Sequence, residues 1–172
     1  MSSNKLINIA PKANVTFSSF SQWSKPDDAR EILTAEHNRP FSFHTLEEEH
    51  PWIELDLQKK YPIQTIILYN RTDGFQFKAY SLNVQISSDK IEYEYIHKGF
   101  IVWNNKIEFN VDGRRIARFI KLSLSDKNYF HLHKIDVFVD NRYVDSNDLI
   151  FDDSKISSFI KYNFFMLVLV VI

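Results

Sequence analysis

Cysteine is absent from this 172-residue sequence, and glycine and proline are scarce, with three and five residues. The lack of cysteine excludes a disulfide framework and any zinc or redox site built on thiolates. Few glycines and prolines, together with 44% hydrophobic residues, exclude intrinsic disorder and indicate one ordered domain. A chain of this length can bury roughly two-thirds of its surface, so it needs no metal or disulfide to fold.

Neither sign of charge predominates, because 21 Lys and Arg residues balance 22 Asp and Glu residues. A near-neutral chain has no general attraction for nucleic acid or for a membrane surface, so we expect neither as a partner. The N-terminal residues lack a charged segment followed by an apolar run, and hence contain no secretory signal as written. With no cysteine, a cytoplasmic location is the simplest interpretation.

The longest hydrophobic run ends the sequence, where residues 164–172 read FFMLVLVVI. Nine apolar residues are too few to span a bilayer, which takes about 20. We expect a buried strand or a stretch cut from a longer chain, and a membrane anchor is the open alternative. We therefore divide the sequence into a domain over residues 1–140 and an acidic linker with an apolar tail over 141–172.

Hydrophobic alternation of period two dominates the middle of the sequence and predicts strands. The predicted strands are 52–57, 63–69, 82–86, 91–95, 107–111, 120–124 and 135–139. Turn residues separate them, and Asp112-Gly113 is typical of a hairpin turn. Helix is scarce, and the best candidate is a short one over 26–34. Many short strands at this spacing predict an all-β, antiparallel sandwich or barrel.

No catalytic motif is complete in the sequence. A Gly-rich phosphate loop and the G-x-S-x-G motif are both missing. His44 and His50 are six residues apart, which does not fit the HExxH metal motif. His131 and His133 share a strand face, but two ligands make an incomplete metal site, so we expect an exposed strand end. No carboxylate pair supports glycoside hydrolysis, and we expect no enzymatic activity.

Residues 70–78 combine charged and aromatic side chains directly after an apolar strand. The cations Arg71 and Lys78 can donate hydrogen bonds to sugar hydroxyls and ring oxygens. Asp73 can orient them, and an aromatic ring such as Phe75 can cover the apolar face of a pyranose. The alternative is an ordinary charged hairpin end, because loops commonly contain such residues.

Five segments, taken in order, resemble the discoidin domains, or F5/8 type C domains, and their carbohydrate-binding relatives. These segments are 8–19, 51–57, 61–71, 118–124 and 132–137. The resemblance covers about residues 7–140. It implies a jelly-roll β-sandwich of about eight antiparallel strands, of the galactose-binding type.

Within that superfamily the sequence is similar to the fucose-binding F-type lectins. Their signature is a His, 26 residues, Arg-x-Asp, four residues, and Arg or Lys, which matches His44, Arg71, Asp73 and Lys78 here. The resemblance implies that His44 and the two cations hydrogen-bond the sugar hydroxyls and ring oxygen, while Asp73 supports the cations. It implies a non-catalytic lectin-like module whose partner is a fucose- or galactose-containing glycan.

The sequence also departs from the F-type lectins. Many members have two adjacent cysteines where Gly74-Phe75 stands, and we expect Phe75 to supply the apolar contact. Lys78 in place of Arg keeps the charge but loses the planar fork. The family binds a structural calcium, but residues 34–39 lack its loop pattern and Lys134 replaces a Glu, so we expect no calcium or other cofactor.

Two further interpretations stay open. The domain could be an accessory part of a carbohydrate-active enzyme such as a glycosyltransferase, fused to it or broken from it. It could also be a discoidin-type protein- or membrane-interaction domain with no sugar site.

We expect Trp23, Phe41 and Phe43 to serve packing rather than sugar stacking, because aromatic side chains of this kind are usually buried.

Overall fold

The computed structural model describes residues 5–24, 26–35 and 39–144, and these ranges contain eleven strands and four short 3-10 helices. The strands are β1 (Leu6–Asn8), β2 (Asn14–Phe17), β3 (Phe43–His44), β4 (Glu48–Glu49), β5 (Trp52–Tyr69), β6 (Leu82–Ser87), β7 (Glu94–His97), β8 (Lys106–Leu124), β9 (Lys127–Asn128), β10 (His131–Leu132) and β11 (Lys134–Asp140). The helices are η1 (Ala10–Lys12), η2 (Pro26–Leu33), η3 (Gln76–Ala79) and η4 (Asn141–Tyr143). All the strand pairs found are antiparallel, so the predicted fold class is confirmed.

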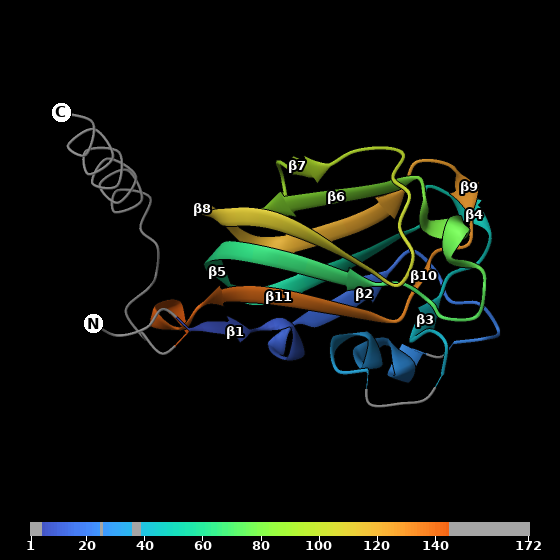
Figure 1. The fold of residues 1–172 in the computed structure, drawn as a ribbon, viewed down its shortest axis with the longest axis horizontal. Coiled ribbons are helices and arrows are strands. Elements are labelled where there is room, and N and C mark those ends of the chain that lie inside the picture. The colour runs from blue at the N-terminus through green and yellow to red at the C-terminus, as the bar shows by residue number, and fades with distance from the viewer. Residues whose placement is uncertain (1–4, 25, 36–38, 145–172) are drawn as a thin grey trace.

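Two long strands, β5 and β8, connect the two layers of the sandwich. They pair with each other along most of their length. The first part of β5 also pairs with β2, and its second part pairs with β11. The β5–β8 ribbon folds over from the layer of β2, β6 and β7 to the layer of β1 and β11 (Figure 1). The apolar faces of the two layers thus enclose one core.

Four of the predicted strands are halves of these two long ones. They are 52–57 and 63–69 in β5, and 107–111 and 120–124 in β8. The hairpin turn predicted at Asp112-Gly113 is wrong. Both residues have left-handed backbone angles, φ 60° and 71°, but they stand at a shift of register within β8. An irregularity of this kind lets a strand bend sharply while its pairing continues.

The predicted alternation is confirmed where the strands face the core. Ile53, Leu55 and Leu57 are each at most 3% exposed. The strand predicted over 91–95 is displaced, because β7 begins only at Glu94 and continues to His97, and Ile91 is 82% exposed. The Asp89 carboxylate accepts the backbone N–H groups of Ile91 (2.8 Å) and Glu92, and this local turn replaces the strand there.

The two ends of the sandwich differ. The small sheets β3–β10 and β4–β9 lie at one end, while β1 begins and β11 ends at the other (Figure 1). After β11, Tyr143 and Val144 pack against the core, so the packed unit extends at least to Val144. The rest of the predicted linker and apolar tail, 145–172, lies outside the described residues. No helix within the described ranges has the length and hydropathy needed to cross a membrane.

Candidate functional site

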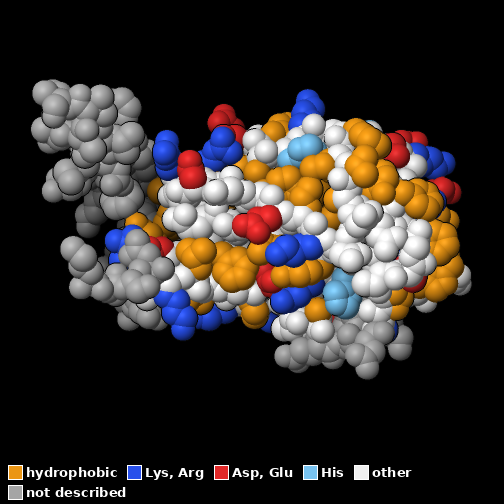
Figure 2. Space-filling view, in the orientation of Figure 1, with side chains coloured by type: hydrophobic (Ala, Val, Ile, Leu, Met, Phe, Trp, Pro, Cys, Tyr) orange, Lys and Arg blue, Asp and Glu red, His pale blue; other side chains and the backbone are white. Residues whose placement is uncertain are grey.

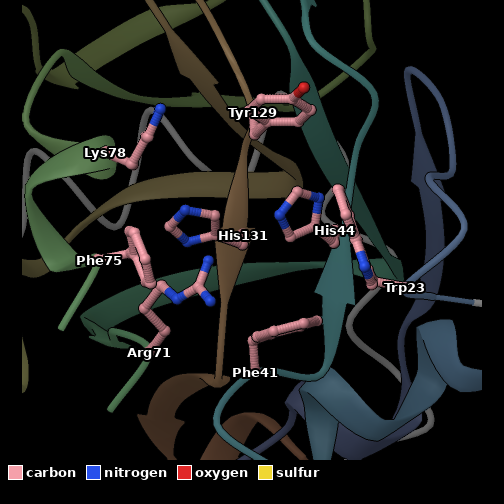
Figure 3. Close-up of a pocket in the computed structure, with 8 residues that line it drawn as sticks. All are labelled: Trp23, Phe41, His44, Arg71, Phe75, Lys78, Tyr129 and His131. Carbon is pink, nitrogen blue, oxygen red and sulfur yellow. The ribbon is translucent and has the colours of Figure 1, made fainter. Parts of the chain in front are cut away.

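A pocket of about 310 Å³ lies at the end of the sandwich that carries the small sheets. Its lining residues, from four separate stretches of chain, are Trp23, Phe41, His44, Arg71, Phe75, Lys78, Tyr129 and His131. Figure 3 shows Arg71 and Lys78 on one side of the pocket, His44 on the other, and His131 between them. The predicted residues His44, Arg71, Phe75 and Lys78 therefore line one pocket. Asp73 does not line it, but its carboxylate contacts Arg71.

The pairing of β3 with β10 positions the two histidines. His44 lies directly opposite His131 in the register, next to the backbone hydrogen bond from Thr45 N to Phe130 O (2.9 Å). Side chains directly opposite each other on one face of a strand pair come close together. The two imidazole ring centroids are accordingly 5.3 Å apart.

Asn70 shapes the loop that holds the cations. It is 1% exposed, and its side chain accepts from Arg71 N (2.9 Å) and donates to Gln76 O (3.1 Å). These bonds tie the end of β5 to the start of η3. A further bond from Thr72 N to Pro40 O (3.2 Å) fixes the loop to the segment that leads into β3. Arg71 and Lys78 are thus held on the same side of the pocket.

His44 presents a hydrogen-bond acceptor to the pocket. Its Nδ1 lies 2.8 Å from the carbonyl oxygen of Thr45, and a carbonyl oxygen can only accept. Nδ1 therefore carries the proton, and Nε2 of the neutral ring is left as the acceptor. Burial lowers the pKa of His44 below its ordinary value, and the neighbouring cations Arg71 and Lys78 lower it further. The neutral ring is the state present near neutral pH.

Arg71 is a buried cation held on several sides. Its guanidinium donates from Nε and Nη2 to the two carboxylate oxygens of Asp73. The rings of Phe41 and Phe75 lie 4.7 Å and 5.0 Å from the guanidinium carbon. The hydrogen bond from Arg71 holds the pKa of Asp73 below its usual range. Of the hydrogen bonds found among the described residues none uses Nη1, which is free to donate to a ligand.

Lys78 extends from η3 toward the pocket mouth. Its Nζ lies 5.6 Å from the centre of the Tyr129 ring and 5.9 Å from that of Phe77. Hydrophobic side chains are exposed over this end of the molecule (Figure 2), and Phe75 and Phe77 are 49% and 53% exposed. The mouth of the pocket thus combines an ammonium group with accessible aromatic rings.

His131 contradicts the expectation of an exposed strand end. The side chain is 1% exposed, and both of its ring nitrogens lack a hydrogen-bond partner among the described residues. Burial, with the charge of Arg71 as the next cause, lowers the pKa of His131 to about 3. The ring is therefore neutral at ordinary pH. An uncompensated buried polar group is costly, and such groups concentrate at functional sites.

Comparison with known proteins identifies the family. The family model of the F5/8 type C domain matches residues 14–135, which is more than half of the chain. This chain belongs to the F5/8 type C family. No curated protein matches the sequence of this F5/8 type C domain.

Solved structures share the fold of the F5/8 type C domain. A fucose binding module from Streptococcus pneumoniae has a TM-score of 0.65 at 19% identity, over 76% of this chain and 96% of that one. A fucolectin from striped bass serum has a TM-score of 0.65 at 19% identity, over 78% of this chain and 47% of that one. A Clostridium perfringens module in complex with GalNAc-β-1,3-galactose has a TM-score of 0.60 at 16% identity, over 77% of this chain and 100% of that one. At these identities the likeness shows the fold.

Several pocket residues of this F5/8 type C domain were not predicted from the sequence. Trp23 and Phe41, which we expected to serve packing, also line the pocket, whereas Phe43 is fully buried in the core. Tyr129 and His131 alternate along the chain with Phe130 and Leu132, which belong to the core. The two-residue period of a strand could therefore have placed Tyr129 and His131 together on the opposite face. Trp23 and Phe41 lie in loops, where no periodicity gives such a signal.

The residues around Lys134 do not fit the calcium ion that the resemblance implies. Lys134 Nζ lies 2.9 Å from Asp136 Oδ1, and Asn8 Nδ2 donates to the same carboxylate (2.8 Å). An ammonium group at this position would repel a cation. In the part of the chain that is described, no three His, Cys, Asp or Glu residues gather as metal ligands. Residues 36–38, in the loop that corresponds to the calcium loop of the family, lie outside the described residues. The absence of calcium therefore stays a prediction.

Proposed function

We propose that this F5/8 type C domain is a non-catalytic carbohydrate-binding module that holds a fucose- or galactose-type sugar in the pocket. The proposal rests on one observation: His44, and the cations Arg71 and Lys78 from a separate part of the chain, line the same pocket. Similar folds described as a fucose binding module and as a lectin domain complexed with Lewis b antigen support it.

The polar groups suit a sugar hydroxyl. A hydroxyl has one hydrogen and two lone pairs, so it can donate to one atom and accept from two others. His44 Nε2 is an acceptor, whereas Arg71 Nη1 and Lys78 Nζ are donors. One hydroxyl can therefore donate to His44 and accept from both cations. Asp73 takes no direct part in this scheme, because it holds the guanidinium in place.

The aromatic groups suit the apolar face of a pyranose. Phe75 is half exposed beside Arg71, and Trp23 is 53% exposed on the opposite wall next to His44, with ring centroids 5.0 Å apart. A sugar that uses one edge for hydrogen bonds presents its C–H groups to such rings. We assign Phe75 the main stacking contact, with Trp23 as a second wall.

The lining residues support binding rather than catalysis. They include no serine, no cysteine and no pair of carboxylates that could act as acid and nucleophile. A Clostridium perfringens structure named CpGH89, in complex with GlcNAc-α-1,4-galactose, contains a similar fold that covers 15% of its chain. A role as an accessory module of a carbohydrate-active enzyme is therefore compatible with the same pocket.

A glycan array tests the proposal. The full chain and its Arg71→Ala variant are applied to an array of neutral, sulfated and carboxylated glycans, with and without a chelator. We expect binding to fucosylated or galactosylated glycans that Arg71→Ala reduces at least about ten-fold, because a lost charged hydrogen bond is worth about 1.5–3 kcal/mol. We expect the chelator to have no effect.

Arg114→Ala is the matched control. Arg114 is exposed and does not line the pocket, so this variant should bind like the unmodified chain. Absence of glycan binding by a folded chain would contradict the proposal and favour an interaction domain without a sugar site. Equal binding by the Arg71→Ala and Arg114→Ala variants would contradict the location of the site.

A further inference from the structure

The charges at the pocket are unbalanced. The carboxylate of Asp73 neutralises Arg71 through two hydrogen bonds. Within the described ranges no carboxylate forms an ion pair with Lys78, whose ammonium group instead lies near the rings of Tyr129 and Phe77. The two histidines add no charge near neutral pH, because burial and the adjacent cations keep both rings neutral. One positive charge is left at the pocket mouth.

Donors also outnumber acceptors. Lys78 offers three N–H groups, and Arg71 offers those of Nη1. His44 Nε2 is an acceptor on the opposite wall, whereas both oxygens of Asp73 already accept from Arg71. The neutral ring of His131 adds one donor and one acceptor, so it leaves the excess of donors unchanged. One neutral hydroxyl satisfies the acceptor and one N–H of each cation, and most of the ammonium donors are then left without a partner. A ligand group rich in acceptors would satisfy them.

The surroundings of Lys78 increase the effect of its charge. The walls of the pocket are largely aromatic, because the rings of Trp23, Phe41, Phe75 and Tyr129 line it. Walls of low dielectric constant concentrate the field of a charge in a cleft. An ammonium group on a flexible stem binds tetrahedral and planar oxyanions as a point charge, without the fixed fork of an arginine.

We propose that the sugar held in this pocket carries a negatively charged substituent, a sulfate or a carboxylate, that lies against Lys78. This inference rests on the proposed function and specifies its ligand as an acidic glycan. His44 and Arg71 bind a hydroxyl of the ring, while Lys78 selects the charge. Sulfate esters and uronic acids share the required chemistry, and the experiment distinguishes them.

Calorimetric titrations with sugars matched in all but charge test the inference. The full chain is titrated with D-galactose, D-galacturonate and galactose 6-sulfate, and with L-fucose and a fucose sulfate, at about 50 and 300 mM salt. We expect the anionic sugars to bind about ten-fold more tightly at low salt, and we expect salt to reduce the preference. Preference for sulfate or for carboxylate identifies the substituent.

Variants at Lys78 test whether this residue causes the preference for anionic sugars. Lys78→Gln should bind neutral and anionic sugars alike, while Lys78→Arg should keep the preference because it keeps the charge. Lys98→Gln is the control, since Lys98 is an exposed lysine outside the pocket. Circular dichroism and melting curves establish that each variant is folded.

Two results would overturn the inference. Equal affinity for neutral and anionic sugars, with binding still dependent on Arg71, would leave the proposed function standing and refute the acidic ligand. A preference for anionic sugars that survives in Lys78→Gln would place the charge recognition elsewhere. Failure of every sugar to bind the folded chain would refute the proposed function and this inference together.

Discussion

His44 combines two properties that make its protonation state decisive for a ligand. Its Nδ1–H is fixed on the Thr45 carbonyl, so the neutral ring has only Nε2 to offer as an acceptor. Protonation would turn Nε2 into a donor and would add a third charge beside Arg71 and Lys78. Asp73 opposes that repulsion, but its carboxylate is already engaged with Arg71.

We predict that sugar affinity falls as the pH is lowered past the pKa of His44. Burial, together with the charges of Arg71 and Lys78, depresses this pKa below the ordinary value of about 6.5, so binding should persist to slightly acidic pH and then weaken. Titrations with L-fucose, which is uncharged, between pH 4.5 and 7.5 measure the effect.

The variant His44→Gln provides the comparison. The amide oxygen of glutamine can replace Nε2 as an acceptor, but the amide does not titrate in this range. Its affinity should be lower at pH 7 and constant with pH. An equally steep pH dependence in the variant would assign the titration to another group.

At the scale of elements, the fold-over of the β5–β8 ribbon connects the two layers of the sandwich. Gly113 stands at this bend with a φ of +71°. A Cβ atom on Gly113 would lie 1.9 Å from Gln64 Nε2 and 2.6 Å from Gln64 Cδ. A side chain at residue 113 would therefore meet backbone strain and would displace the Gln64 side chain.

We predict that Gly113→Ala lowers the free energy of unfolding by about 1–3 kcal/mol, from backbone strain and displacement of the Gln64 side chain. Gly99→Ala is the matched control, because Gly99 also has a positive φ (+95°), but a Cβ atom added there would meet nothing within 4 Å. Urea unfolding measures both. A cost for Gly113→Ala no greater than that for Gly99→Ala would show that the Gln64 contact is unimportant.

At the scale of the whole molecule, His131 makes stability depend on pH. The buried ring is neutral in the folded chain, with a pKa of about 3, whereas an unfolded chain takes up a proton near pH 6.5. The unfolded state therefore binds more protons between these values. The contribution of His131 to the free energy of unfolding is complete above pH 6.5 and is lost progressively as the pH falls toward 3.

We predict that the free energy of unfolding falls between pH 6 and 4.5, with His131 contributing up to about 1.4 kcal/mol per pH unit. His131→Phe keeps a ring in the same space but binds no proton, so its stability should decline less steeply over this interval. His44 and the carboxylates remain in both proteins, and the difference between the two slopes isolates His131. Identical slopes would contradict the assignment.

Sequence pattern predicted the parts of the fold that depend on local alternation. Ile53, Leu55 and Leu57 face the core because a strand alternates its side chains, and this needs no knowledge of the partner strand. The continuity of β5 and β8 was missed, since turn-like residues such as Asp112-Gly113 also occur where a strand bends. Distinguishing a turn from a bend depends on whether the strand keeps its partner beyond that point.

The sequence by itself determined the all-β class, because alternation is a property of the chain order. The resemblance to the F-type lectins indicated the candidate residues His44, Arg71, Asp73 and Lys78, because the matching motif is also read along the chain. Only the tertiary structure decided that β10 brings His131 against His44, that Trp23 and Tyr129 form a wall, and that Lys78 has no described carboxylate partner. These features depend on contacts between segments as far apart in the sequence as Trp23 and Tyr129, and charge balance in a pocket is set by such contacts.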